Sequence, residues 1–454
     1  MLKDEFKFLK GLCKPCKKSF KYLFKYKGSY RKYVNKKILV AGGYGYHNVG
    51  DEAQYYTTMK LLRERYIDYE IVSLTPKLDD YFVRYPEFHH ELASRVLVFN
   101  QGTDFNYYDF NNLHDGSKIK KIFFIIKSLW AIFNARLVRA NLPTLCINAE
   151  TARFLHEIKT AKLFYFCGHG SFTGETLSRL WDAIFICRCC FIMRVPVVVS
   201  GVNAGLWGSK FTKCYSRWGF RHVNAFTVRD YGFSLHDLEE IGLSGENYFA
   251  THDDALFCEK SEERQIKTRN YITINFHYWG CMPDDRIALL EKIKQIVDYV
   301  TNNTEYYLVF VPMDPGDKRP FKEFITKYPN ERFTCFDYDF DFRKVRRVIG
   351  DSKLCITMRH HPIIFAMGEN VPVIALNLMK YFTFKNTGAL AQYGMDQFII
   401  NINDISFIDD FAEKLNSILS SYKEVTEKIN DSKHRLSDQK ERFLKLVDKI
   451  VYGS

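Results

Sequence analysis

Residues 353–368 constrain the fold most strongly, because they have the pattern of a buried strand that runs directly into a helix. Residues 354–358 are apolar or β-branched, which is typical of a strand covered on both faces of a parallel sheet. Pro362 suits the first helical position, where its missing N–H is not needed for a hydrogen bond. This strand–turn–helix unit therefore predicts an α/β fold with a parallel sheet.

The turn in this unit concentrates three basic side chains, Arg359, His360 and His361, in front of the predicted helix. A helix N-terminus offers free N–H groups and the positive end of its dipole, so the turn is suited to a small, strongly anionic ligand. The alternative is a turn that serves only the fold. Because Pro362 favours an extended backbone at His361, we expect the two histidine rings to diverge and only one to enter the site.

Alternating strand and helix patterns fill most of the chain and form two blocks, separated by the charged residues 258–270. This alternation predicts two doubly wound, Rossmann-like α/β domains facing each other across a cleft, with ligands beyond the carboxyl ends of the strands. We predict a basic aromatic arm over 1–37, an N-terminal domain over 38–257, a linker over 258–270, a C-terminal domain over 271–404, and C-terminal helices over 405–454.

The positive charge is concentrated in the predicted arm. The 454 residues carry a net charge of +12, and residues 1–37 alone hold thirteen Lys or Arg against two acids, Asp4 and Glu5. Aromatic residues alternate with these basic residues, a mixture that suits an anionic membrane surface. The alternatives are a solvated tail and a nucleic-acid partner; because no nucleic-acid motif accompanies the arm, we expect no nucleic acid.

We expect a cytoplasmic protein that is at most peripheral to the inner face of the membrane. The N-terminus lacks the apolar segment of a signal peptide. No apolar run reaches the roughly 20 residues of a membrane span, and residues 122–133, interrupted by Lys127, are expected to form a buried helix. Many of the 12 cysteines lie in apolar segments, which indicates buried thiols in a reducing compartment.

The sequence predicts neither a metal site nor a cofactor. Cys13 and Cys16 have CxxC spacing, but no second pair follows at the distance of a zinc site. His89–His90 and His360–His361 are adjacent pairs, and neighbouring side chains on regular structure do not face one metal.

A glycine-rich loop over residues 42–52 lies between the first predicted strand and helix, and contains Asn48, Gly50 and Asp51. Its carboxylates would repel a dinucleotide pyrophosphate, and no Gly-Lys-Ser/Thr sequence follows as in a P-loop. Asn48 or Asp51 could cap the helix alone, or the loop could combine capping with binding of a ligand hydroxyl. The second interpretation is the one we favour.

Two further strand ends carry candidate binding residues. Gly168, His169 and Gly170 follow one predicted strand, and Arg229 closes another. Each signal is weak alone: His169 could be a structural hydrogen-bond donor, and Arg229 beside Asp230 could be a surface ion pair. The predicted parallel sheet nevertheless brings strand ends to one edge, where these side chains could share a site.

In this order, these motifs resemble the polysaccharide pyruvyl transferase family. The resemblance covers most of residues 38–400 and rests on residues 48–53, 168–170, 228–230, 253–255, 359–361 and 371–373. The chain departs from the family pattern in having His169 between two glycines, where three glycines are common, and His360, where leucine is usual. The basic arm lies outside the resemblance.

The resemblance implies a glycosyltransferase-B-like fold, with phosphoenolpyruvate as donor and a sugar of a polysaccharide or its lipid-linked precursor as acceptor. It implies that the product is a cyclic pyruvate ketal, with the acceptor on the N-terminal domain and the donor on the C-terminal domain. By the same resemblance Arg229 and Arg359 bind the donor's anionic groups, His361 takes part in catalysis and His360 supports it.

The chemistry of such a transfer agrees with the residues. Arginine suits planar anions, histidine can supply a proton near neutral pH, and Asp51 is a candidate base for the sugar hydroxyls. One alternative is a B-type glycosyltransferase that uses a nucleotide sugar. Another is a non-catalytic sugar-binding protein of the same fold.

Overall fold

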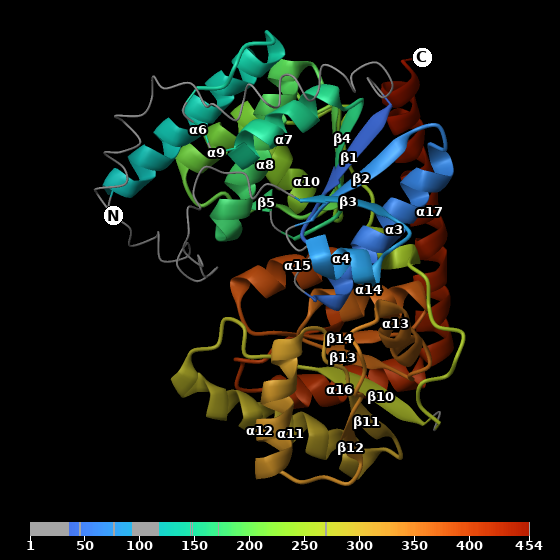
Figure 1. The fold of residues 1–454 in the computed structure, drawn as a ribbon. Helices are drawn as coiled ribbons and strands as arrows, with labels where there is room; N and C mark the ends of the chain where they lie inside the picture. The colour runs from blue at the N-terminus through green and yellow to red at the C-terminus, as the bar shows by residue number, and fades with distance from the viewer. Residues whose placement is uncertain are drawn as a thin grey trace.

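The computed structural model describes residues 36–453, apart from 45–46, 76–77, 93–117, 146, 148, 171 and 268–269. The predicted basic arm lies outside the described residues, except for Lys36 and Lys37, and Lys37 already begins the first strand. Two parallel sheets lie one above the other in Figure 1, with helices α3 (Val49–Arg65), α14 (His360–Gly368) and α15 (Lys380–Ala391) between them. The predicted α/β architecture of two Rossmann-like halves is confirmed.

The first sheet contains seven parallel strands in the order β3-β2-β1-β4-β6-β8-β9. Successive strands are added first on one side of β1 and then on the other, which is the doubly wound arrangement. A short pair, β5 (Phe172–Thr173) and β7 (Ala204–Gly205), lies beside the sheet's strand ends. The strands are β1 (Lys37–Ala41), β2 (Glu70–Thr75), β3 (His89–Leu92), β4 (Leu163–Phe166), β6 (Val197–Val202), β8 (Ala225–Val228) and β9 (Tyr248–Ala250).

Side chains alternate between the two faces of this sheet, so each face has its own core. On β1, Leu39 packs in the core with helices α6 to α9, whereas Ile38 and Val40 pack in the core with α3 and α4. Covering both faces explains why the strands are apolar almost throughout. The helices are α3 (Val49–Arg65), α4 (Leu78–Arg84), α6 (Lys118–Arg139), α7 (Ala149–Thr160), α8 (Leu177–Met193), α9 (Lys210–Phe220) and α10 (Ser234–Glu240).

The second sheet contains six parallel strands in the order β12-β11-β10-β13-β14-β15. Its strands are β10 (Tyr271–Asn275), β11 (Tyr307–Phe310), β12 (Phe333–Cys335), β13 (Cys355–Thr357), β14 (Val373–Asn377) and β15 (Ile399–Asn401). Its helices are α11 (Arg286–Asn303), α12 (Lys318–Lys327), α13 (Phe342–Gly350), α14 (His360–Gly368), α15 (Lys380–Ala391) and α16 (Phe407–Ser420).

The last helix, α17 (Tyr422–Tyr452), runs along both halves, and Figure 1 shows it as the long red helix. Ile429 and Leu436 pack in the core of the second sheet, whereas Phe443 and Val447 pack in a core of the first. The C-terminal segment is helical as predicted, and it also joins the two halves.

Helix α14 is buried along its whole length, which agrees with the predicted strand–turn–helix unit. It begins two residues earlier than predicted, since Arg359 is the N-cap and His360 the first helical residue. Pro362 is therefore the third residue of the helix rather than the first, and the predicted extended backbone at His361 is wrong. A proline in the first turn still blocks no intrahelical hydrogen bond.

Helix α6 differs from the expected buried helix. Ala131, Ala135 and Val138 are buried, whereas Leu129 is 50% and Phe133 39% exposed on the opposite side. The helix is thus apolar on two sides, of which one faces the core. No helix in the described part of the chain is both long and apolar enough to cross a membrane.

Candidate functional site

Loops at the carboxyl ends of strands from both sheets meet between the two halves. The first sheet contributes Asp51, Arg229 and Asp253, while the second contributes the turn after β13 and one residue of α15. We call this group the interdomain cluster; its members are Asp51, Arg229, Asp253, Arg359, His360, His361 and Lys385.

Gly50 allows the N-terminal ends of α3 and α14 to approach each other closely. A Cβ atom at Gly50 would lie 1.8 Å from Cγ of His361, so no larger residue fits without displacing the ring. Asn48 is the N-cap of α3, and its side-chain oxygen accepts hydrogen bonds from the N–H groups of Gly50 at 3.1 Å and Asp51 at 3.3 Å. The capping interpretation of Asn48 is therefore confirmed, and binding of a hydroxyl by this loop stays a prediction.

Asp253 is the buried centre of the cluster. Nε2 of Gln54 donates to both carboxylate oxygens at 2.8 Å, Nη1 of Arg229 forms an ion pair, and Nε2 of His360 lies 3.2 Å away. Burial by itself would raise the pKa of Asp253, but Arg229 and the two histidines hold it well below its ordinary value. The carboxylate is therefore charged and links the two halves.

Arg229 is fully buried and held on two sides. Its Nε donates to Oδ1 of Asn203 at 2.7 Å, and Nη1 pairs with Asp253 rather than with the neighbouring Asp230. Asp230 instead accepts the N–H of Ser234 at 2.7 Å, at the start of α10. Arg229 is thus an interior residue, not one half of a surface pair.

Arg359 is oriented by a carboxylate of its own half. Its Nε and Nη2 donate to the two oxygens of Asp317 at 3.0 and 2.5 Å. Asp317 is fixed in turn by the N–H of Met313 at 3.1 Å and Nδ2 of Asn275 at 3.3 Å. This bidentate pair uses one edge of the guanidinium, so the edge containing Nη1 is not committed to Asp317.

The two histidines lie together rather than apart. Their ring centroids are 5.3 Å apart at an interplanar angle of 75°, and Nε2 of His361 lies 3.9 Å from both Asp51 and Asp253. The expectation that only one ring enters the site is wrong, because both belong to the first turn of α14. Burial and Arg229 lower the pKa of His360 to about 3, and burial also lowers that of His361 well below its ordinary value.

Two further groups in the cluster titrate near neutral pH. Burial raises the pKa of Asp51 to about 6, against the opposing charges of Arg179 and Lys385. Burial and the nearby Arg229 lower the pKa of Lys385 to about 7. The side chains of His361 and Asp51 are 10% and 20% exposed, so a ligand can reach this part of the cluster.

The glycine-rich loop after β4 forms one wall of the cluster. The N–H of Gly168 donates to Oδ2 of Asp254 at 3.0 Å, and the carbonyl of Gly170 accepts the hydroxyl of Tyr381 at 2.9 Å. A Cβ atom at Gly170 would lie only 2.7 Å from Nζ of Lys385. Between these glycines His169 is buried, and burial and Arg179 lower its pKa well below the ordinary value.

Sequence reasoning missed Asp317 and Lys385 as members of the site or as its support. Asp317 precedes α12, and Lys385 lies in mid-helix on α15, so neither belongs to a local motif that would indicate a site residue. Asp253 was found only through the resemblance. Among the described residues, no group of three or more His, Cys, Asp or Glu side chains is arranged to hold a metal ion.

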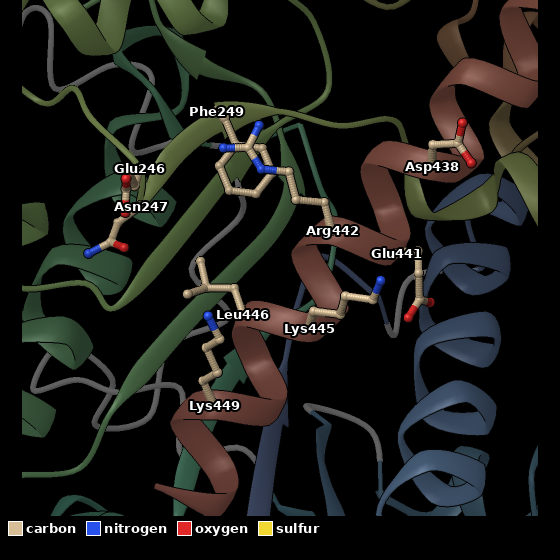
Figure 2. A pocket seen from close by; sticks show the side chains of 9 residues that line it. All are labelled: Glu246, Asn247, Phe249, Asp438, Glu441, Arg442, Lys445, Leu446 and Lys449. Carbon is tan, nitrogen blue, oxygen red and sulfur yellow. The ribbon is translucent and has the colours of Figure 1, made fainter. Parts of the chain in front are cut away.

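A separate groove of about 590 Å³ lies between α17 and β9 and shares no residue with the cluster. Figure 2 shows Arg442 beside Phe249, and the guanidinium carbon lies 4.9 Å from the ring centroid. The groove combines Glu246, Asp438 and Glu441 with Lys445 and Lys449, so its charges are mixed and no anion site results.

Two parallel α/β halves with site residues at their facing strand ends define the B-type glycosyltransferase architecture. Solved structures agree: a putative UDP-N-acetylglucosamine 2-epimerase from Listeria monocytogenes has a TM-score of 0.52 and 13% identity, covering 87% of this chain and 89% of that one. A glycosyltransferase from Rickettsia africae has a TM-score of 0.51 and 11% identity, covering 92% and 99%. At such identities the likeness shows the fold alone.

The family is shown by sequence. The family model of polysaccharide pyruvyl transferases matches residues 48–378, which include every member of the interdomain cluster except Lys385. The chain belongs to the polysaccharide pyruvyl transferase family. No curated protein matches it.

Proposed function

We propose that the protein transfers a pyruvyl group from phosphoenolpyruvate to a sugar of a cell-surface polysaccharide or its lipid-linked precursor, forming a cyclic pyruvate ketal. The observation that carries this proposal is the interdomain cluster at the N-terminus of α14. There Arg359 and Lys385 provide cationic groups for a small anion, and His361 and Asp51 lie 3.9 Å apart in a position that a ligand can reach. A dianionic phosphate and a carboxylate on one small donor match this charge.

The proposed reaction joins one carbon of phosphoenolpyruvate to two sugar hydroxyls. A proton is added to the methylene carbon of phosphoenolpyruvate, and the first sugar hydroxyl forms a bond to the neighbouring carbon. The carbon–oxygen bond to phosphate then breaks, and the second hydroxyl attacks the same carbon to close the ketal. The two hydroxyls lose one proton each. This balances the proton gained by the methylene carbon and the proton that leaves with phosphate.

His361 is the proposed proton donor, so its ring must be protonated when the donor is bound. In the free protein burial favours the neutral ring. A ligand with a carboxylate and a phosphate brings negative charge beside the ring, which favours the protonated form. Donor binding would therefore load the acid that the first step needs, and His360 would support it by holding Asp253.

Asp51 is the proposed base for the sugar hydroxyls. With a pKa of about 6 it is mostly ionised at pH 7, yet it is close enough to neutrality to accept a proton. It lies at the N-terminus of α3 in the first half, which we assign to the acceptor, opposite the donor-binding turn of the second half. Asn48 and Gly50 position Asp51 through the cap, while Gly168, His169 and Gly170 form the adjoining wall. The proposed reaction needs no metal and no cofactor besides the co-substrate.

Calorimetric titration with phosphoenolpyruvate tests the donor site. Arg359→Lys keeps the charge but loses the fork that lets one guanidinium contact Asp317 and a ligand at once. We expect affinity to fall at least about tenfold, which corresponds to about 1.4 kcal/mol.

Arg319→Lys is the matched control, since Arg319 lies on the surface of α12 and is 62% exposed. It should bind the donor like the unchanged protein. Equal affinities of the Arg359→Lys variant and the unchanged protein would contradict the donor assignment.

A further inference from the structure

Helix α6 presents a second apolar stripe on the side opposite the core. Ile126, Leu129 and Phe133 are 38%, 50% and 39% exposed. Their spacing of three and four residues places them on one face of a helix. Figure 1 shows α6 at the outer edge of the N-terminal half, on the opposite side from α17.

Cationic residues continue this stripe. Arg136 follows Phe133 by three residues, and a hollow of about 670 Å³ at the end of the helix is lined by Arg136, Arg139 and Arg194 together with Phe191, which is 44% exposed. None of the described residues that line the hollow is acidic. The sequence of α6 contains six Lys or Arg and neither Asp nor Glu. We call Ile126, Leu129, Phe133, Arg136, Phe191 and Arg194 the α6 face.

We propose that the α6 face is an interfacial membrane-binding surface that docks on anionic lipid headgroups. A helix with an exposed apolar stripe and a strongly basic composition lies in the plane of the bilayer interface, where apolar side chains enter the acyl boundary and arginines hold the headgroups. An anionic bilayer provides both kinds of partner at once.

Charge argues against the other possible occupants. Residues 1–37 carry thirteen Lys or Arg against two acids, so their charge does not complement the arginines of this face. A second copy of the chain, docked face to face, would bring two arginine clusters together. A nucleic acid offers negative charge but no apolar layer for Leu129 and Phe133. The proposal does not depend on which donor the enzyme uses.

Vesicle co-sedimentation of the full chain tests the proposal. The probes are phosphatidylglycerol-containing vesicles and purely phosphatidylcholine vesicles, each at low and high salt. The key variant is Leu129→Glu/Phe133→Glu. Its control is Ile67→Glu/Ile405→Glu, which makes the same charge change at residues that are 86% and 102% exposed elsewhere.

We expect the unchanged protein and the control to partition onto anionic vesicles alike, within about twofold, and the key variant to bind at least tenfold more weakly. A second variant, Arg136→Gln/Arg194→Gln, should bind anionic vesicles more weakly than the unchanged protein and bind neutral vesicles alike. Equal binding of the key variant and its control would overturn the proposal, as would failure of the unchanged protein to bind.

Light scattering without vesicles completes the test. A dimer of the unchanged protein that the key variant converts to a monomer would assign the α6 face to a second copy and overturn the membrane role. A monomer in both cases is the expected result.

Discussion

At the scale of single residues, Gly50 determines whether His361 can occupy its position between Asp51 and Asp253. A Cβ atom there would lie 1.8 Å from the imidazole, so Gly50→Ala must displace the ring. We expect turnover to fall at least about a hundredfold, since a shift of about 1 Å at a reacting group has this effect. Gly232→Ala is the control, because a Cβ atom at Gly232 meets nothing within 4 Å. Comparable steady-state rates for the two variants would contradict the proposed position of the acid.

His360 and His361 have different proposed roles, so their variants should have different effects on turnover. His361→Ala should abolish turnover while phosphoenolpyruvate still binds, because the proposed acid is lost and Arg359 and Lys385 remain. His360→Ala removes a partner of Asp253 and should reduce turnover without abolishing it. Calorimetry and phosphate release measured on both variants decide the matter: an inactive His360→Ala beside an active His361→Ala would exchange their roles.

The lowered pKa of Lys385 leads us to expect that the protein takes up protons when the donor binds. Its pKa of about 7 leaves the amine mostly neutral at pH 8, where a phosphate monoester with a second pKa of about 6 is already fully ionised. A bound anion raises the pKa of the amine, so we expect Lys385 to take up as much as about one proton per donor at pH 8.

Titrations in buffers of different ionisation enthalpy measure this uptake. Lys385→Met should remove the share of the lysine and leave the uptake by His361, whereas Lys380→Met, at the first residue of α15, should leave the uptake unchanged. Binding to the unchanged protein without proton uptake would mean that Lys385 does not face the donor.

The sequence allowed prediction of the residues that carry a local signature and missed those that act through space. Asn48 and Arg359 stand at strand–helix junctions, where a cap or a helix N-terminus can be expected from neighbouring residues. Asp317 and Lys385 reach the site only because β11 and β14 are neighbours of β10 and β13 in the sheet. No local pattern encodes such a meeting.

At the scale of secondary structure, one lysine of α17 holds the glycine-rich loop that follows β4. Nζ of Lys440 donates to Oδ1 of Asp254 at 2.5 Å, and Oδ2 of Asp254 accepts the N–H of Gly168 at 3.0 Å. Lys440→Met leaves a carboxylate that is only 2% exposed without its cation. We expect a loss of about 3 kcal/mol in the free energy of unfolding.

Urea denaturation measures that loss. The surface variant Lys445→Met, on the same helix in Figure 2, should change stability by no more than about 0.5 kcal/mol. Lys440→Arg should recover most of the lost stability, because it restores a cation beside Asp254. Equal stability of the two methionine variants would mean that the buried pair does not secure the loop.

Element boundaries and exposure were less predictable than element types. The strand–turn–helix unit around Arg359 follows from local pattern, but α14 starts at His360 rather than Pro362, and its first turn packs closely against α3 at Gly50. The apolar residues of α6 likewise predicted burial, although only one of its two apolar sides meets the core. The spacing of apolar residues shows which face of a helix they share, but it does not show whether that face is buried or exposed.

At the scale of the whole molecule, the alternation of strands and helices was enough to predict two doubly wound halves. The alternation did not predict that α17 packs on both halves, because the sequence of this charged helix does not indicate which surfaces it contacts. The contacts of Asp253 with Arg229 and His360 join the halves at the cluster, and α17 joins them along their side. The site therefore requires both halves in their observed arrangement.

Pyruvyl transfer is tested by incubating the protein with phosphoenolpyruvate and lipid-linked or polymeric glycans. The glycan is then analysed by mass spectrometry, and free phosphate is determined. We expect the mass increment of a pyruvyl ketal and an equal amount of phosphate, both dependent on acceptor and both absent with His361→Ala. Phosphoenolpyruvate left intact beside a glycan of unchanged mass would contradict this reaction, and sugar transfer in a parallel incubation with a nucleotide sugar would assign the protein to the alternative one.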